Sequence, residues 1–331
     1  MSSNLRLVKA VNATNNSIEV AMIRNSILEC IGNTPLIRLS SVSSRYDCDV
    51  YIKMESLNPG GSHKARIALN MIEKAEQQGV LVPHSGQTII EPSGGNTGLG
   101  LVMAANLKGY KVVLVIPDNY SVKKQKLLKL YGAQVVNSDA TQGNNSHGEL
   151  ALELTLKNPD YVMLNQQRNP ANPDTHVKYT SQEILRQLPN TVSLDYMIAG
   201  IGTGGHISGI SKVLKEAYPE LTIVGVEPEG CALLEDIHSP HQIQGLSVGI
   251  IPQTLDVTVL NHMVNVDFED CVQVIHRTVR EESIALGISS AANLVAIDKL
   301  SQQFDLAGKR ILTFCYDSVD SYLEQLKLEL N

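Results

Sequence analysis

The stretch Asn58-Pro59-Gly60-Gly61-Ser62-His63-Lys64-Ala65-Arg66 governs the interpretation of the whole chain. It lies between a strand-like run, residues 50–55, and a helix-like run, residues 67–78, so that Lys64 stands at the glycine-rich start of a helix. A lysine that is held there away from water loses its proton readily and becomes a nucleophile toward a carbonyl carbon. Alone, the stretch is more often a turn followed by a surface lysine, because short motifs match by chance.

Length and composition indicate a soluble globular protein. The 331 residues are 43% hydrophobic and 18% charged, and this length predicts about two domains or subdomains. The net charge of −7 comes without a lysine- or arginine-rich run, which argues against nucleic acid and anionic membranes as partners. No apolar run approaches the ~20 residues that cross a bilayer, and the first residues contain no apolar signal core. We therefore expect a cytoplasmic protein.

The five cysteines and nine histidines follow no disulfide or metal-binding pattern. The cysteines are scattered and never form a Cys-x-x-Cys pair, which predicts reduced and largely buried thiols. The histidines show neither His-x-x-x-His nor His-Glu-x-x-His spacing. We therefore predict that the protein binds no metal.

Strand-like and helix-like segments alternate from residue 26 onward. Strands are predicted at residues 36–39, 50–55, 87–91, 111–116, 135–136, 196–199, 222–226, 264–266 and 310–315. Helices are predicted at residues 26–31, 67–78, about 98–108, 121–131, 206–217, 269–286, 290–303 and 321–330. This alternation indicates an α/β fold in which two units with helices on both sheet faces share a cleft. The polar residues 1–24 are interpreted as an N-terminal arm.

Three glycine-rich loops each follow a predicted strand and begin a predicted helix, where α/β folds bind their ligands. The loop Gly202-Thr203-Gly204-Gly205-His206 suits a phosphate, because its backbone can close around an anion. The loop Ser93-Gly94-Gly95-Asn96-Thr97-Gly98 suits a carboxylate, and Asn96 can donate to a phenolate-type oxygen. The loop Gly287-Ile288-Ser289-Ser290-Ala291-Ala292 offers hydroxyl groups. Each loop by itself is also explained by a tight turn or a helix cap.

Together and in this order, the motifs resemble the cysteine synthase/cystathionine β-synthase family of fold-type II pyridoxal-phosphate enzymes. The resemblance rests on residues 59–66, 91–98, 200–205 and 287–290, with shorter stretches at 31–36, 165–166, 169–173, 225–228 and 317–322. It implies two three-layer α/β/α subdomains with the cofactor in the cleft between them. Residues 25–60 and 169–331 would form the larger subdomain, which binds the cofactor phosphate. Residues 61–168 would form a smaller, mobile subdomain that carries the lysine and the carboxylate loop.

The resemblance also implies roles for individual residues. Lys64 would bind pyridoxal phosphate covalently and later move the substrate α-proton, Asn96 would bond the ring hydroxyl, and Ser289 the pyridine nitrogen. A serine in that place does not enforce a protonated ring, which favours loss of a β-leaving group over a long-lived carbanion. The remaining ligands would be Gly202, Thr203, Gly204, Gly205 and His206 for the phosphate, and Ser93, Gly94, Gly95, Thr97 and Gln166 for the substrate carboxylate.

The implied reaction is a β-replacement by a homodimeric enzyme with small amino-acid substrates. An activated L-serine (O-acetylserine, O-phosphoserine or serine) would lose its β-substituent, and a nucleophile would add to the resulting aminoacrylate. Two alternatives stay open within catalysis: a specialised synthase that adds an amine, an amino acid or homocysteine, with 2,3-diaminopropionate-type products, and a serine/threonine deaminase that only eliminates. A third, a non-catalytic binding protein, is opposed by the presence of Lys64, Asn96 and Ser289.

Several positions depart from the usual pattern of the family. Ala65 replaces a common Asp, Gly94 stands in a loop that usually reads Thr-Ser-Gly-Asn-Thr, and His206 replaces a Thr. Residues 245–249, Gly-Leu-Ser-Val-Gly, are bulkier than the usual Gly-Ile-Gly-Ala-Gly. Most of these changes fall around the substrate, so they leave the donor and the nucleophile open. We expect His63 to serve in packing, because neighbours in an extended loop point apart, and His206 to contribute its backbone N–H.

Overall fold

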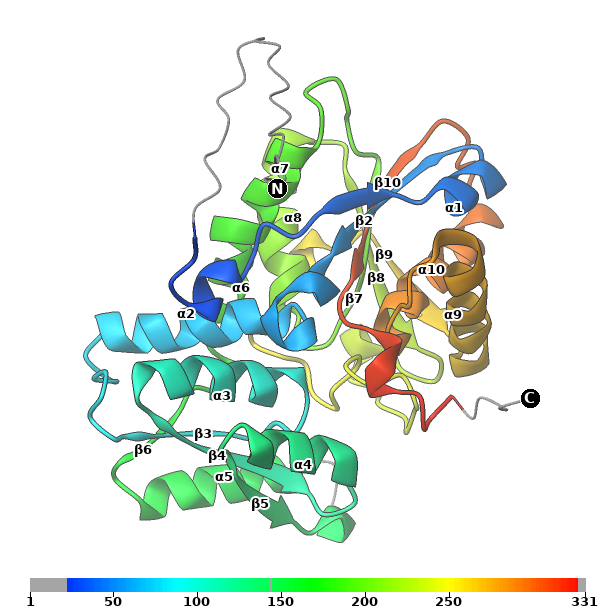
Figure 1. Cartoon of the computed structure of the whole chain (residues 1–331). Helices are drawn as coiled ribbons and strands as arrows, with labels where there is room; N and C mark the ends of the chain where they lie inside the picture. The colour runs from blue at the N-terminus through cyan, green and yellow to red at the C-terminus, as the bar shows by residue number, and fades with distance from the viewer. Residues whose placement is uncertain (1–22, 143–144, 327–331) are drawn as a thin grey trace, which may run out of the picture.

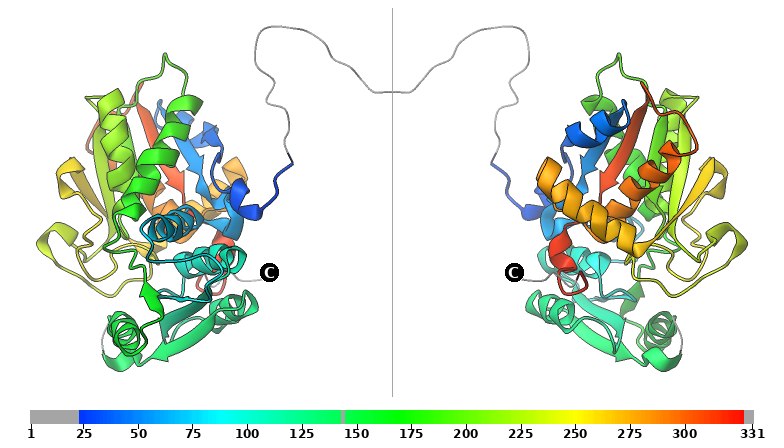
Figure 2. Two further views of the ribbon diagram at one scale, coloured as in Figure 1. Left: turned by 90° about the vertical axis from the view of Figure 1, so that its left-hand side faces the viewer. Right: turned by 90° about the vertical axis from the view of Figure 1, so that its right-hand side faces the viewer.

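The computed structural model describes residues 23–142 and 145–326 (Figure 1). The predicted N-terminal arm lies almost wholly outside the described residues, and so does the end of the helix predicted at 321–330. The described chain forms two β-sheets, one above the other in Figure 1, and helices cover both faces of each sheet (Figures 1 and 2). The predicted α/β architecture, with two three-layer units, is confirmed.

The larger sheet has six strands in the order β1-β2-β10-β7-β8-β9. They are β1 (Leu36–Arg38), β2 (Asp49–Met54), β7 (Tyr196–Gly200), β8 (Thr222–Pro228), β9 (His262–Val266) and β10 (Arg310–Cys315). Every neighbouring pair is parallel except β1 and β2. The central strands are almost continuously buried because both of their faces are covered, which explains their unbroken apolar sequences.

Helices enclose the larger sheet on both sides. One face packs against α1 (Ser40–Arg45), α9 (Phe268–Glu282) and α10 (Ile288–Ser301). The other face packs against α7 (Ser181–Gln187) and α8 (Gly205–Ala217). Helix α10 lies between the sheet and α9, and it is buried along most of its length. Its buried residues accordingly lie on every side of the helix rather than along one stripe.

The smaller sheet has four parallel strands in the order β5-β4-β3-β6. They are β3 (Thr88–Glu91), β4 (Lys111–Pro117), β5 (Gln134–Ser138) and β6 (Tyr161–Met163). On one face lie α2 (Lys64–Gln77), α3 (Asn96–Lys108) and α4 (Val122–Leu130), and on the other lies α5 (Ser146–Lys157). The subdomain boundaries at residues 60/61 and 168/169, and the mobility of the smaller unit, stay predictions.

The segment between β5 and β7 contains elements that the sequence pattern did not predict. They are α5, β6, α6 (Ala171–Thr175), a π-helix (His176–Thr180) and α7. Strand β6 has three half-buried residues at the edge of its sheet, too few to show a strand pattern. Helix α9 ends at Glu282, four residues earlier than predicted, because Ser283 adopts a positive φ of 56°.

Both sheets direct their strand ends toward the space between them. Strand β2 leads to the loop before Lys64, β3 leads to the loop 92–95, and β7 leads to the loop 201–204. Strand β10 leads to Asp317. Parallel α/β sheets bind ligands at the carboxyl ends of their strands, so the fold gathers all the predicted loops at one place.

Three further findings concern the described residues. No helix there is long and apolar enough to cross a membrane. No cluster of three or more His, Cys, Asp or Glu side chains in this part of the chain could hold a metal ion, and the absence of a metal stays a prediction. The five cysteines are free thiols; Cys30 is exposed and the others are buried, as their scattered sequence positions predicted.

Candidate active site

A cavity of about 330 Å³ opens between the two units and continues into a deeper one of about 60 Å³. Lys64, Asn96 and Thr203 line both cavities, so the two form one site. The site has walls from both sheets, because its lining includes the loop after β3 and the loop after β7. A concave pocket with convergent polar groups is the usual form of a small-molecule site.

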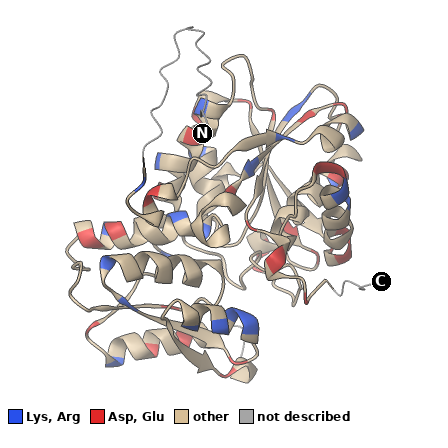
Figure 3. Cartoon of the chain, in the orientation of Figure 1, with Lys and Arg blue, Asp and Glu red and all other residues tan. Residues whose placement is uncertain are grey.

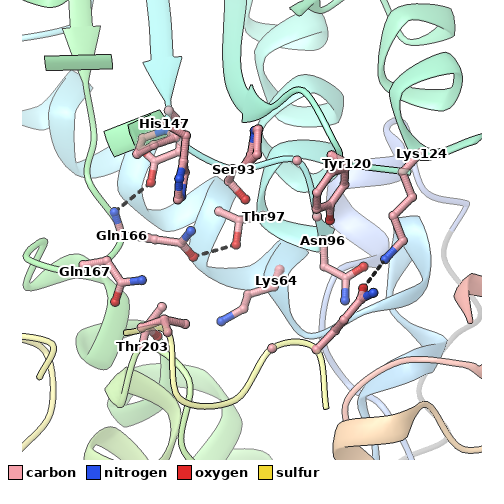
Figure 4. Close-up of a pocket in the computed structure, with 18 of the residues that line it drawn as sticks. Lys64, Ser93, Asn96, Thr97, Tyr120, Lys124, His147, Gln166, Gln167 and Thr203 are labelled. Carbon is pink, nitrogen blue, oxygen red and sulfur yellow. Dashed lines mark hydrogen bonds between the residues drawn. The ribbon is translucent and has the colours of Figure 1, made fainter. Parts of the chain in front are cut away.

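Lys64 is the first residue of α2, and its amine points into the pocket (Figure 4). Gly60 and Gly61 bring the chain there with φ values of 78° and 75°, which side chains other than glycine rarely tolerate. Burial lowers the pKa of Lys64 to about 8, although the negative charge of Asp317 opposes the shift. A substantial fraction of this amine is therefore uncharged near neutral pH, as nucleophilic attack requires.

The lowered pKa predicts how the protein takes up an aldehyde cofactor. The rate of pyridoxal-phosphate attachment to the apoprotein should rise with pH around a midpoint near 8, because only the uncharged Lys64 amine attacks. Stopped-flow absorbance at a series of pH values measures this, with Lys64→Ala protein subtracting attachment to surface lysines. A midpoint near 10.5, the value of an ordinary lysine, would contradict the proposed environment.

Asp317 is a buried acid that directs other groups of the site. Its Oδ2 accepts hydrogen bonds from Asn96 Nδ2 at 2.7 Å and from the Tyr322 hydroxyl at 2.5 Å. Burial raises the pKa of Asp317, and the bonds from Tyr322 and Asn96 oppose that rise. The Asn96 side chain is thereby fixed in orientation beside Lys64 in the deeper cavity. Sequence reasoning noted Asp317 only within a motif, although its place directly after a buried strand was a signal.

The predicted carboxylate loop lines the main cavity with Ser93, Gly94, Gly95, Asn96 and Thr97, and Gln166 lies opposite (Figure 4). The Thr97 hydroxyl donates to Gln166 Oε1 at 2.6 Å, so the amide of Gln166 is held while its N–H groups stay available.

The backbone beside Gln166 is fixed by a buried carboxylate. Glu91 accepts from the N–H of Asn165 at 2.8 Å and from that of Gln166 at 2.9 Å. Burial raises the pKa of Glu91 to about 7, against the effect of these two bonds. The carboxylate loop and Gln166 thus form a rigid set of donors.

Ile116 and Tyr120 leave no room for a side chain at position 94, where the family pattern usually has serine. A Cβ at position 94 would lie 2.6 Å from Ile116 Cγ2 and 2.9 Å from Tyr120 Cε1. Both distances are shorter than real contacts allow, and Ile116 is fully buried. The aromatic ring of Tyr120 therefore occupies the side of the pocket where a residue at 94 would project.

The predicted phosphate loop forms a cradle that excludes side chains. A Cβ on Gly202 would lie 2.2 Å from the carbonyl oxygen of Gly245, and Gly204 has a φ of 78° against Leu255. Thr203 Oγ1 accepts from Asn172 Nδ2 at 3.0 Å, which leaves its own proton to donate. The N–H groups that begin α8 lack helical partners, as in every helix. Gly205 packs on Asn172 and is absent from the cavity lining.

Three buried histidines meet beside this loop. The ring of His206 lies 4.7 Å from that of His176 and 5.4 Å from that of His63, and it packs edge-on against Phe314 and Tyr316. Burial, followed by nearby positive charge, lowers the pKa of all three well below 6.5, so the imidazoles are neutral.

The conformation of His63 differs from what its sequence position suggested, and the backbone role of His206 stays a prediction. His63 has a helical φ/ψ of −58° and −19° rather than an extended one, so that its ring and Lys64 both line the deeper cavity, although we expected them to point apart. The ring of His63 also packs against Tyr316, which agrees with a packing role. Neither ring nitrogen of His206 has a protein partner. The ring of His206 therefore offers a donor in addition to its backbone N–H.

The pocket fits pyridoxal phosphate. A glycine cradle without room for side chains suits the phosphate. The neutral ring of buried His206 has one N–H, and neither of its nitrogens has a protein partner, so this N–H can donate to an anion there. Ser289, at the start of α10, lines the same deeper cavity and offers a hydroxyl to a ring nitrogen. Lys64 stands between this cavity and the carboxylate loop. A two-sheet α/β fold with a deprotonatable lysine between an anion cradle and a carboxylate loop defines a pyridoxal-phosphate-type enzyme.

The comparisons with known proteins assign the family. The pattern of the family "Pyridoxal-phosphate dependent enzyme" matches residues 27–317, and the chain belongs to this family. A cysteine synthase from Flavobacterium sp. is 42% identical over 261 residues, which are 78% of this chain and 83% of that protein. The structure of an O-ureido-L-serine synthase aligns with a TM-score of 0.88 at 36% identity, and covers 94% of this chain and 98% of the other.

A third relative uses a donor that its name specifies. The O-acetylserine-dependent cystathionine β-synthase from Helicobacter pylori aligns with a TM-score of 0.85 at 31% identity, over 93% of this chain and all (100%) of that chain. These relatives confirm the resemblance to the cysteine synthase/cystathionine β-synthase family and its cofactor, pyridoxal phosphate. The roles of the individual site residues stay predictions.

Sequence motifs missed several residues of the pocket. Tyr120, Lys124, His176 and Gln244 line it or support it, yet none of them belongs to a motif in the sequence. Only the packing of distant segments brings them to the cleft, and no local spacing signals their role. The π-helix at His176 was the most distinctive local feature, since such turns often mark functional sites.

Proposed function

We propose that this protein catalyses a pyridoxal-phosphate-dependent β-replacement on an activated L-serine. The observation that carries the proposal is the position of Lys64, whose amine borders both the anion cradle and the carboxylate loop. The family and the cysteine synthase relatives support the same chemistry. When bound, the cofactor supplies an electron sink for the substrate α-carbon.

The chain's own residues would bind and orient the two partners. Lys64 would hold the cofactor covalently, Asn96 and Ser289 its ring, and the loop 202–206 its phosphate. The loop 93–97 and Gln166 would hold the substrate carboxylate by N–H and hydroxyl donors. Glu91 holds the backbone of Gln166, Thr97 holds its side chain, and Asp317 holds Asn96. Because these groups are oriented in advance, little ordering is left for the moment of binding.

The amine of Lys64 would also move the proton at the substrate α-carbon. Its lowered pKa of about 8 places proton uptake and release close to neutral pH, which favours general acid–base catalysis. Closure of the smaller unit over a bound carboxylate would exclude water from the reactive product of elimination. A homodimer and a cytoplasmic location belong to the same proposal, supported by the resemblance and by the sequence composition respectively.

A spectral titration tests this function. The holoenzyme is mixed separately with O-acetyl-L-serine, O-phospho-L-serine and L-serine, and the visible absorbance of the cofactor is recorded. Sulfide, homocysteine or an amino acid is then added, and mass spectrometry identifies the product. We expect at least one donor to change the spectrum, and a nucleophile to restore it with formation of a β-substituted alanine. Keto acid formation that ignores every nucleophile would instead show a deaminase.

A further inference from the structure

Helix α4 carries four lysines, and one of them differs from the rest (Figure 3). Lys123, Lys126 and Lys129 are exposed to solvent, whereas Lys124 is half buried and lines the main cavity. Figure 4 shows its side chain reaching into the pocket across from Lys64. Lys124 therefore adds a second cation to a cavity that already contains the reactive lysine.

The charge of Lys124 is not neutralised by a carboxylate. Its Nζ donates to Gln244 Oε1 at 2.9 Å and lies 4.8 Å from the ring centroid of Tyr322 and 5.7 Å from that of Tyr120. Within residues 23–142 and 145–326 no acid forms a salt bridge with it. Asp317 supplies a more distant negative charge, and its Oδ2 is already bonded to Asn96 and Tyr322. Aromatic faces and one amide are weak substitutes for a counter-ion.

The rest of the cavity does not supply an anion either. Glu91 is the sole acid in the lining of the main cavity, and its two oxygens accept backbone N–H groups. Burial lowers the pKa of Lys124, with the charge of Asp317 opposing, as expected for a cation that has lost water without gaining a close partner. Such a cation is costly to keep unless a ligand pairs with it.

In the proposed function, the substrate α-carboxylate has a binding loop of its own. Residues 93–97 and Gln166, which line the main cavity, would supply N–H, hydroxyl and amide donors to it, and they carry no formal charge. Lys124 does not belong to this loop, and its amine lies beside Tyr120, Gln244 and Tyr322 in the lining of the same cavity. A second anionic group on the substrate is the chemistry that this cation fits.

We propose that Lys124 is a specificity-determining residue that binds an oxyanion placed beside the β-carbon of the reacting serine, in the first place the phosphate of O-phospho-L-serine. The proposal rests on the proposed β-replacement and names its substrate class. The same oxyanion chemistry can arrive on the nucleophile, as the carboxylate of an amino acid, and the experiment separates these two sources. The alternative is that the bond between Lys124 and Gln244 only ties α4 to the loop after β8.

The experiment compares donors in the cofactor-loaded enzyme. The values of kcat/KM are measured for O-phospho-L-serine and O-acetyl-L-serine with sulfide, in the wild type, Lys124→Gln, Lys124→Arg and the matched control Lys126→Gln. We expect Lys124→Gln to lower kcat/KM for O-phospho-L-serine about tenfold or more, since a charge-assisted bond is lost. The value for O-acetyl-L-serine should stay within about twofold. Lys124→Arg should recover most of the loss, and Lys126→Gln should match the wild type.

Two further measurements, with other nucleophiles and with inorganic phosphate, distinguish the remaining outcomes. If the oxyanion is on the nucleophile, Lys124→Gln slows the reaction with an amino acid but spares the reaction with sulfide, which also supports the proposal. An equal loss for every donor and nucleophile, or no loss, overturns it. If the wild type replaces no β-substituent at all, the proposed function fails, and calorimetry with inorganic phosphate then tests Lys124 by itself. Equal phosphate affinity in the wild type and Lys124→Gln would overturn the proposal.

Discussion

Replacing Lys64 by alanine should abolish the covalent attachment of pyridoxal phosphate and lower β-replacement on the order of a thousandfold or more. The side chain is expected to act twice, as the nucleophile toward the cofactor and as the group that moves the α-proton. No other lysine lines the deeper cavity, as far as the described residues extend, so that no neighbour can take over both roles.

Two measurements check this expectation. Borohydride reduction followed by mass spectrometry should show the added mass of the cofactor on a peptide containing Lys64 in the wild type and not in Lys64→Ala. Turnover of the donor identified by the spectral titration gives the second measurement. Lys126→Ala, which removes an exposed lysine, serves as the matched control and should behave like the wild type. Cofactor mass retained in Lys64→Ala would refute the assignment.

Replacing Arg66 by methionine should lower the free energy of unfolding by about 3–5 kcal/mol. Arg66 is 3% exposed, and its guanidinium donates to Glu55 at 2.6 Å and 2.8 Å and to both oxygens of Glu183 at 2.7 Å. Lys53, also buried, bonds Glu183 at 2.8 Å. Methionine fills a similar volume but carries no charge. The buried carboxylates of Glu55 and Glu183 would therefore lose the positive charge of Arg66. The cost follows from those unpaired charges rather than from a cavity.

Urea unfolding of wild type and Arg66→Met at several pH values measures this loss. Although burial raises the pKa of Glu183, the bonds from Arg66 and Lys53 outweigh it and lower the pKa to about 2, from 4.5. A depressed folded-state pKa contributes stability above about 4.5 that is lost as the pH falls toward about 2. The difference between the two proteins should therefore shrink on acidification.

The matched control for this prediction is Arg38→Met. Arg38 forms an ion pair with Asp49 at 2.5 Å, but both side chains are well exposed, so its loss should change stability little. An equal effect of the two substitutions would show that burial of the Arg66 network contributes nothing.

The sequence predicted those parts of the fold whose pattern is local and repeated. The strands at residues 111–116 and 310–315 are nearly continuous apolar runs, because helices cover both of their faces. Such runs are typical of buried parallel strands, as was predicted. Ser121 caps α4 by accepting from the N–H of Lys124, as its residue type and position predicted. The region 146–187 was missed, because its strand is short and its helices are interrupted by a π-turn. Helix α5 in the same region was also missed.

The sequence predicted those parts of the site that belong to glycine-rich motifs. The loops 93–98 and 202–206 and Lys64 share one pocket, and their order along the chain had indicated that they act together. Lys124 and Gln244 were not predictable, because 120 positions separate them and only the packing of α4 against the other unit brings them into contact. Lys124 differs from the other lysines of α4 because no carboxylate lies close to its amine. Which charges lie close to an amine depends on the folded structure and cannot be read from the sequence.

The packing around Gly94 couples the residues that positions 94, 116 and 120 can hold. A side chain at position 94 cannot coexist with Ile116 and Tyr120 in their present places. A serine at position 94 is therefore compatible with Tyr120 only if Tyr120 or Ile116 moves or is replaced. The effect of a change at either position therefore depends on the other, which is epistasis with a steric origin. A serine introduced at position 94 alone should disturb the packing of the loop. The same serine introduced together with a smaller residue at 116 and at 120 should fit.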